Sequence, residues 1–262
     1  MKTFKKIISN KYLLSILGIV FFFLLWTAIY FIAGQRQSVF PSPIETIQEA
    51  FSYLGDAYIY KCIWGSLERM LIGFGIASIL GIIVGVIVGN YTNLKYVFNP
   101  TMIALKAIPT AAIVFLFLVM AGLRNAPIYV VAIIVFPMVY EATVSGYNHV
   151  PDEILQAARV DSNNRLYTNF KIKFPLSFPY IALGLVSSFA LSFKIEIMAE
   201  VISGSSSYGL GRAIQSAYIN STTGLVSTFA YAFIAIVVML IVSLIIAIIK
   251  KVTKLNDLIE AK

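Results

Sequence analysis

The 262-residue chain has little of the chemistry on which soluble enzymes depend. It contains one cysteine, Cys62, and one histidine, His149. A single cysteine excludes an intrachain disulfide and a thiolate metal cluster, and a single histidine argues against a histidine metal site or a Ser-His-Asp triad. No Gly-Lys pair occurs, so the phosphate-binding pattern Gly-x-x-x-x-Gly-Lys-Ser/Thr is missing. We expect a chain that is not an enzyme and that itself holds no metal, cofactor or ATP.

Charge is also scarce, whereas long apolar runs are abundant. Charged residues make up 12% and hydrophobic residues 59% of the chain, against roughly 25% charged in soluble domains. About six windows are apolar and long enough to cross a bilayer. They cover residues 12–33, 66–89, 98–120, 127–146, 177–202 and 228–249. Because the runs are continuous rather than alternating, they predict an all-α integral membrane protein, with one transmembrane domain over residues 1–262.

The net charge of +8 follows membrane topology rather than a nucleic-acid partner. With these spans, Arg36, Lys61, Arg124 and Arg212 fall on one side of the membrane. The larger basic group falls on the other side: Lys2, Lys5, Lys6, Lys11, Lys95, Arg159, Arg165, Lys171, Lys173, Lys250, Lys251, Lys254 and Lys262. Basic residues concentrate in cytoplasmic loops. We therefore predict a multi-pass plasma-membrane protein with both termini and the 150–175 loop inside, and residues 34–60 and 203–226 outside.

The 150–175 loop has the sequence of two short helices joined by a turn. Pro151, Asp152 and Glu153 suit a first helical turn. Ile154, Leu155, Ala157 and Ala158 then give an apolar face, the polar run 161–164 makes a turn, and Leu166 and Phe170 share one side of a second helix that Pro175 ends. The loop could rest on lipid headgroups or dock into a partner's groove. Docking is favoured, because the first helix carries few basic residues.

Other features leave two readings open. Gly81, Gly85 and Gly89 lie four apart on one helix face, which suits either packing within the chain or a subunit interface. Pro109 and Pro137, with Pro175 and Pro179, can kink helices for hinges or for packing. The Ser- and Gly-rich segment 203–211 is predicted to be a flexible connector, with an outer gate as the alternative.

Charged residues inside spans are functional candidates because they are costly in a membrane. They are Glu68, Arg69, Lys106, Glu141, Lys194, Glu196 and Glu200. Glu68 and Arg69 lie near the outer boundary and can snorkel. Glu196 and Glu200 share a helix face and need cations, for which Lys194, Lys106 and Arg69 are available. Internal pairing is favoured over an anion path lined by Lys106 and Lys194. The charge of any solute stays open.

The loop resembles the "EAA" loop of ABC-importer permeases. The pattern stands as Gln156-Ala157-Ala158-Arg159-Val160-Asp161-Ser162, followed by Phe174-Pro175 and Pro179. Gln156 replaces the usual glutamate and Asp161 the usual glycine. The resemblance implies that this loop contacts an ATPase subunit. The implied contact residues are Glu153, Leu155, Gln156, Ala157, Ala158, Arg159, Asp161, Ser162 and Arg165.

Further landmarks are similar to the nitrate, sulfonate and taurine subgroup of these permeases. In order they are Pro41-Ser42-Pro43, Ser66-Leu67-Glu68-Arg69, Asn99-Pro100, Lys106-Ala107-Ile108-Pro109, Phe136-Pro137, Ala199-Glu200 and Gly209-Leu210-Gly211. The resemblance implies a permease core over about 60–250 and a homodimer of this subunit. It also implies two ATPase subunits that bind ATP and Mg, and an extracytoplasmic solute-binding protein. The solute would be a small anion such as nitrate, a sulfonate or taurine, or a vitamin-like precursor.

Two other classes of membrane protein compete with this interpretation. An ion-coupled secondary transporter would use Glu141, Glu196 and Glu200, but such proteins usually contain more spans or an inverted repeat, and the two halves show no similarity. A membrane enzyme would need clustered catalytic residues, which the sequence does not show.

Overall fold

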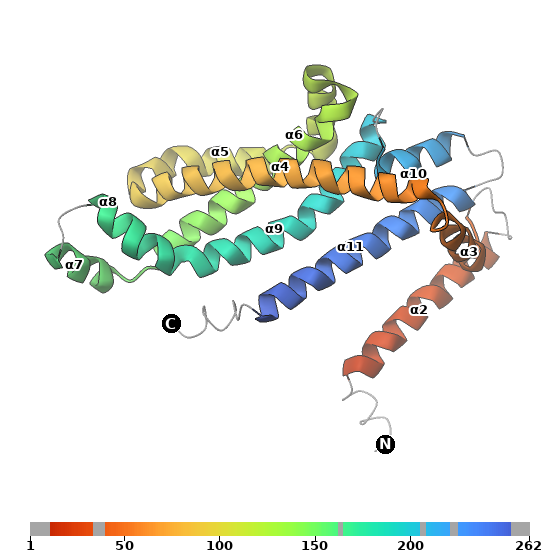
Figure 1. The fold of residues 1–262 in the computed structure, drawn as a ribbon, viewed down its shortest axis with the longest axis horizontal. Coiled ribbons are helices and arrows are strands. Elements are labelled where there is room, and N and C mark those ends of the chain that lie inside the picture. Colours follow the sequence, from red (N-terminus) through yellow and green to blue (C-terminus); the bar gives the residue numbers. More distant parts are fainter. Residues whose placement is uncertain (1–10, 34–39, 162–164, 205–207, 221–224, 253–262) are drawn as a thin grey trace, which may run out of the picture. The chain divides into compact units, whose positions relative to one another are not determined.

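The computed structural model describes residues 11–33, 40–161, 165–204, 208–220 and 225–252, and every regular element in these ranges is helical (Figure 1). The chain divides into two compact units, residues 1–60 with 213–234 and residues 61–212 with 235–262, which are described separately. The helices are α2 (Lys11–Ile32), α3 (Pro43–Tyr53), α4 (Ala57–Asn90), α5 (Lys95–Ala107), α6 (Thr110–Asn148), α7 (Asp152–Asp161), α8 (Arg165–Thr168), α9 (Phe174–Ser203), α10 (Leu210–Ile219) and α11 (Val226–Val252). A short 3-10 turn, η1 (Thr92–Leu94), precedes α5, and a π-helical turn, η2 (Asn169–Lys173), precedes α9.

Within the described ranges, five helices are long and apolar enough to cross a membrane: α2, α4, α6, the helix over 169–203, and α11. This confirms the all-α membrane fold. The predicted window 98–120 is not one continuous helix, however. Helix α5 ends at Ala107, and Ile108 takes an extended backbone with ψ 127° before Pro109. The residue before a proline is disfavoured in the helical region, which accounts for the break.

Helix α6 is itself interrupted at Gly122, whose φ of 74° and ψ of 170° are not helical. A positive φ at this position is adopted easily by glycine and at a cost by residues with a Cβ. The helix therefore consists of two stretches, 110–121 and 123–148. The second stretch packs lengthwise against α9 (Figure 1), and Val131 and Val135 are fully buried in the core that it forms with Ala199.

The unit that contains residues 1–60 and 213–234 is held together by aromatic side chains. Trp26 donates its indole N–H to the carbonyl of Pro41 at 3.2 Å, and its ring contacts those of Phe40 and Phe229. Tyr53 stacks on Tyr231 with ring centroids 4.5 Å apart. Burial raises the pKa of Tyr53 to about 12, so the phenol stays protonated and donates to Glu49 at 2.7 Å.

In the other unit, the glycine face of α4 packs against α6 of the same chain. A Cβ on Gly81 would lie 2.8 Å from Cβ of Val139, and one on Gly89 would lie 2.7 Å from Cβ of Tyr147. Thr143 occupies the equivalent place beside Gly85. Of the two uses that the sequence left open, the structure shows packing within the chain, in which missing side chains let two membrane helices approach closely.

This contact predicts opposite effects for two alanine substitutions in α4. Gly81→Ala forces a methyl group against Val139 and the backbone of Tyr140, which should lower the free energy of unfolding by about 1–3 kcal/mol. Gly75 has nothing within 4 Å of its Cβ position, so Gly75→Ala should raise stability by roughly 0.5–1 kcal/mol. Thermal unfolding of both purified variants measures the difference. Equal melting temperatures would show that α4 and α6 are not in this contact.

Candidate functional site

Three of the sequence landmarks meet at one buried ionic cluster, although they are far apart in the chain. Ser66 and Arg69 come from α4, Glu196 and Glu200 from α9, and the segment Tyr208–Gly211 precedes and opens α10. Ser66, Glu196 and Glu200 are fully buried and Arg69 is 8% exposed. We call these four side chains and the Tyr208–Gly211 backbone the Arg69 cluster.

Arg69 lies at the centre of the cluster. Its Nε donates to Oε1 of Glu196 at 3.1 Å, and its Nη2 donates both to Oε1 of Glu200 and, at 2.8 Å, to the carbonyl oxygen of Tyr208. One guanidinium thus joins two carboxylates of α9 and the backbone of the following segment. The planar, permanently charged fork of arginine suits such a multiple contact better than lysine would.

Glu200 and Ser66 hold the same segment from the other side. Glu200 accepts the hydroxyl of Ser66 at 2.8 Å and the backbone N–H of Gly211 at 2.8 Å, both on Oε2. Ser66 in turn accepts the backbone N–H of Leu210 at 2.9 Å. Two N–H groups of the first turn of α10 are therefore satisfied by membrane-helix side chains, and Leu210 is fully buried.

Glycines let the backbone come this close. A Cβ on Gly209 would lie 2.6 Å from Nη2 of Arg69 and 2.7 Å from the carboxylate of Glu200. A Cβ on Gly211 would lie 2.9 Å from the backbone nitrogen of Val201. The motif Gly209-Leu210-Gly211 is thus explained by contact with the cluster. For residues 208–211 the predicted flexible connector is wrong, while Ser205, Ser206 and Ser207 lie outside the described residues.

The structure also corrects the predicted pairing of Lys194. Its side chain is exposed and forms no ion pair with any residue in the described ranges. Lys194 lies two positions before Glu196, which on a helix places it on roughly the opposite face. The cation for both glutamates is Arg69, so Arg69 does not snorkel to the surface. Glu68 beside it is exposed.

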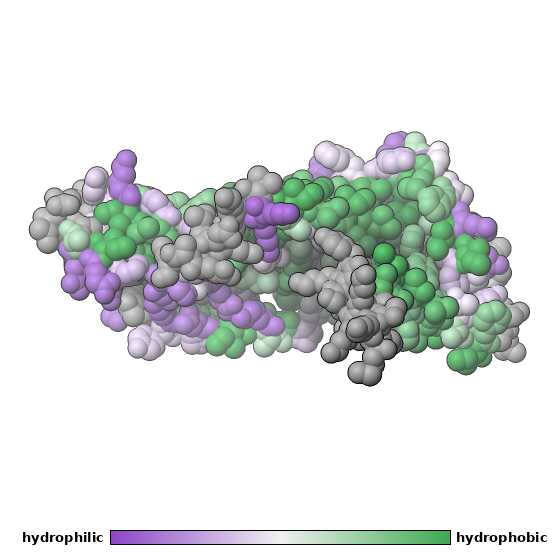
Figure 2. Space-filling view, turned by 90° about the horizontal axis from the view of Figure 1, so that it is seen from below, coloured by the Kyte–Doolittle hydropathy of each residue, from purple (hydrophilic) through white to green (hydrophobic). Residues whose placement is uncertain are grey.

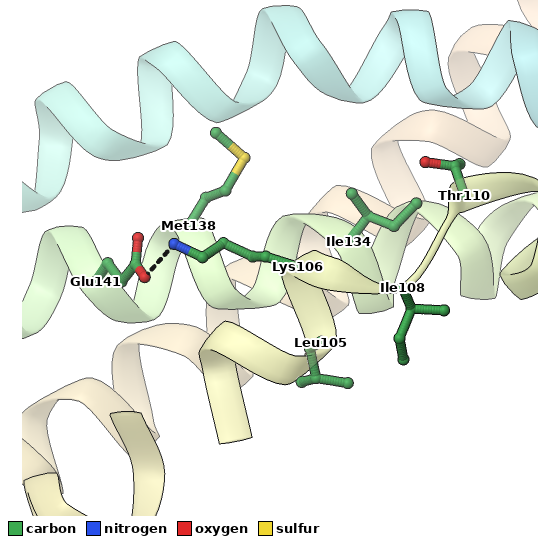
Figure 3. Close-up of a pocket in the computed structure, with 7 residues that line it drawn as sticks. All are labelled: Leu105, Lys106, Ile108, Thr110, Ile134, Met138 and Glu141. Carbon is green, nitrogen blue, oxygen red and sulfur yellow. Dashed lines mark hydrogen bonds and ion pairs between the residues drawn. The ribbon is translucent and has the colours of Figure 1, made fainter. Parts of the chain in front are cut away.

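Lys106 has a separate partner, Glu141, in a second candidate site (Figure 3). Lys106 is near the end of α5 and Glu141 is on α6, and their side chains are 42% and 46% exposed. They line a cavity of about 250 Å³ with Met138, Ile134 and Thr110. Because Glu141 lies on a helix long and apolar enough to cross a membrane, a half-exposed ion pair here would be costly against lipid, so this face suits water or a protein partner rather than acyl chains.

Helix α7 presents the predicted ATPase-contact residues. Glu153, Gln156 and Ala157 are exposed and Leu155 is half-buried, and hydrophilic residues gather at this end of the molecule (Figure 2). For Ala158, Arg159, Asp161 and Arg165 only the helical backbone is described, and Ser162 lies outside the described residues. The two acids Asp152 and Glu153 stand in the first turn of α7, as predicted.

Both ends of this loop are fixed to the membrane helices. Before α7, the ring of His149 stacks on that of Tyr180 with centroids 4.6 Å apart. After α8, Asn169 accepts a hydrogen bond from Asn90 at 3.0 Å. Lys173 donates to the carbonyl of Gly89 at 3.0 Å. The 150–175 loop is therefore fixed to α9 at its start and to the end of α4 at its end.

The predicted stop at Pro175 is wrong, because the helical backbone continues from α8 through η2 into α9. Proline removes an N–H and clashes with the carbonyl four residues before it. The π-helical turn over Asn169–Lys173 absorbs the mismatch, since its wider turn changes the hydrogen-bond register just ahead of the proline. Pro175 thus sits in the first turn of α9.

A comparison with known families decides the class of protein. Residues 77–254 match the family described as "Binding-protein-dependent transport system inner membrane component". The chain belongs to this family. The match confirms the resemblance to ABC-importer permeases, and it includes the 150–175 loop, α9 and the Tyr208–Gly211 segment.

Curated members of the family are similar over most of their length. The nitrate import permease protein NrtB of Synechocystis sp. is 28% identical over 194 residues, or 69% of each chain. The bicarbonate transport system permease protein CmpB of Synechococcus elongatus is 30% identical over 219 residues, 79% of this chain and 77% of CmpB. The putative aliphatic sulfonates transport permease protein SsuC of Bacillus subtilis is 24% identical, covering 71% and 67%.

A solved structure shares the permease fold. In the inward-facing MetNI methionine ABC transporter, one chain superimposes with a TM-score of 0.63 at 12% identity, covering 74% of this chain and 95% of that chain. At this identity the similarity concerns the fold alone.

The Arg69 cluster predicts a large contrast between two membrane cations. Arg69→Met leaves two buried carboxylates without their counter-charge, which should destabilise the protein by about 3–5 kcal/mol. Lys194→Met removes an exposed charge that has no ion pair in the described structure and should change stability by less than about 0.5 kcal/mol. Thermal unfolding of the two detergent-purified variants gives the comparison. A melting temperature for Arg69→Met as high as that of Lys194→Met would contradict the cluster.

Proposed function

We propose that this chain is the permease subunit of an ATP-driven importer, which forms the membrane path for a small anion delivered by an extracytoplasmic binding protein. The family match over residues 77–254 carries the proposal. The relatives named for nitrate, bicarbonate and sulfonates supply the class of solute. Two copies of the chain would form the path, and ATP and Mg would be bound by two partner ATPase subunits.

The attachment of the 150–175 loop supports a lever mechanism. Closure of the ATPase subunits would push on α7. Because the loop is fixed to α9 through His149 and Tyr180, and to α4 through Lys173 and Gly89, the push reaches two membrane helices together. A motion transmitted this way needs no binding of ATP by the permease itself, which lacks a phosphate-binding loop.

Six crossings remain our proposal for the topology, with both termini in the cytoplasm. The breaks at Ile108 and Gly122 allow α5 and residues 110–121 to make one bent crossing and residues 123–148 to make the next. The asymmetry of the basic residues supports an orientation in which α7 would lie inside and the Arg69 cluster near the outer end.

The alternative class, an ion-coupled secondary transporter, would need free carboxylates, but its three candidate acids are all engaged in ion pairs. Glu141 is paired with Lys106, Glu196 with Arg69, and Glu200 with Arg69, Ser66 and the N–H of Gly211. A coupling acid has to exchange its ion with solvent during transport, whereas Glu196 and Glu200 are fully buried.

The test is an over-packing substitution on the exposed face of α7. Ala157→Trp should weaken association with the ATPase about 10- to 100-fold, because over-packing a tight contact costs about 1–3 kcal/mol. Solute-stimulated ATP hydrolysis in reconstituted vesicles should fall accordingly. Asn93→Trp, an exposed change in η1, is the matched control and should retain both. Normal ATPase pull-down and hydrolysis with Ala157→Trp would refute docking at α7. Uptake that continues without any ATPase would refute the importer itself.

A further inference from the structure

A cavity of about 540 Å³ lies beside the Arg69 cluster and has not been assigned a role. Its polar wall consists of Lys61, Glu68 and Arg69 from α4, Arg124 and Asn125 from α6, and Tyr208. The volume is within the range of about 300–1,000 Å³ that is typical of small-molecule sites. All of these residues belong to the same compact unit.

The charged side chains on this wall differ in whether they are already paired. Arg69 is already paired with two carboxylates, those of Glu196 and Glu200, which are fully buried and do not line the cavity. Lys61 is exposed, with its Nζ 5.6 Å from the centre of the Tyr208 ring. Arg124 is exposed and makes no ion pair with a residue in the described ranges. Among the lining residues, Glu68 is the acid that opposes them. The three exposed charges at the cavity surface, Lys61, Arg124 and Glu68, therefore sum to +1 and favour a negatively charged occupant.

The wall also has suitable donors for an oxyanion. The guanidinium of Arg124 offers parallel N–H groups, which match the oxygens of sulfonate, nitrate or bicarbonate better than a single ammonium does. Asn125, beside it, adds the two N–H donors of an amide. Arg124 and Asn125 follow the break at Gly122, and Tyr208 is held by its hydrogen bond to Arg69. Two sides of the cavity are thus fixed by the fold.

We propose that this cavity is a receiving site for a small oxyanion at the outer end of the permease, with Arg124 and Lys61 as its contacts. That the anion enters from the outer side of the membrane rests on the proposed function. The assignment of Arg124 and Lys61 rests on the cavity itself. Glu68 moderates the attraction and keeps the bound anion exchangeable, since its removal would strengthen the positive field.

The test uses a reporter cysteine, Asn125→Cys, in the full-length permease in sealed vesicles, with the native chain as the control for buried Cys62. Labelling rates are compared for a methanethiosulfonate reagent that carries a sulfonate and for its trimethylammonium counterpart. The sulfonate reagent should react faster. Adding Arg124→Gln or Lys61→Gln should reduce the ratio of the two rates by at least about five-fold, as expected for a unit charge at about 4 Å in water. Adding Glu68→Gln should raise it.

Ethanesulfonate should also protect the reporter from both reagents more than sodium chloride does at equal ionic strength. Equal rates for the two reagents, no change with Arg124→Gln and Lys61→Gln, or protection no greater than that by chloride would overturn the site. If Arg124→Gln fails to fold, the rise expected for Glu68→Gln still decides the question. Labelling needs neither ATP nor an ATPase. A negative labelling result would therefore overturn the anion site and leave the importer proposal standing, and uptake without an ATPase would overturn the importer proposal and leave the anion site standing.

Discussion

The buried pairing of Arg69 with Glu196 and Glu200 is the constraint on which the membrane-helix packing depends. An isolated charge at this depth would cost several kcal/mol, so α4 and α9 have to stay in the register that brings these groups together. Two carboxylates share one guanidinium, and the remaining hydrogen-bonding capacity of Glu200 is filled by Ser66 and by the N–H of Gly211. Any motion that separates α4 from α9 therefore also releases the first turn of α10.

Helix α4 links the other parts of this unit. One face of α4 carries glycine at positions 81, 85 and 89, and its lack of side chains there lets it pack closely on α6. The Arg69 face contacts α9 and the Tyr208–Gly211 segment. At the far end of α4, the carbonyl of Gly89 accepts a hydrogen bond from Lys173 of the 150–175 loop. A lever that moves the loop is thus connected through α4 to the segment before α10, and this connection gives the proposed transport mechanism a continuous path of contacts.

Much of the fold could be predicted from the sequence, because continuous apolar runs of about 20 residues indicate helices that span a membrane. The glycine spacing correctly indicated a close helix contact, but spacing on one helix does not tell which helix faces it. For the same reason Glu196 and Glu200 were recognised as needing a cation, whereas the choice of Arg69 over Lys194 required the positions of two helices. The role of Gly209 and Gly211 could not be read from the sequence, because it is a close approach of the backbone to side chains from other helices. Gly209 leaves room for Arg69 and Glu200, and Gly211 donates its backbone N–H to Glu200. The breaks at Ile108 and Gly122, and the π-helical turn before Pro175, depend on local backbone geometry that hydrophobicity does not report.

Hydrogen exchange at the amides of Leu210 and Gly211 tests the central claim most directly. In the structure these N–H groups donate to Ser66 and Glu200 inside the buried cluster, so they should exchange as slowly as amides in the middle of α9. The exposed end of the same helix, Tyr218 and Ile219, provides an internal reference and should exchange much faster. In the purified full-length protein in lipid nanodiscs, slow exchange at Leu210 and Gly211 is the predicted result. Exchange at both sites as fast as at Tyr218 and Ile219 would mean that Arg69, Glu196 and Glu200 do not hold this segment.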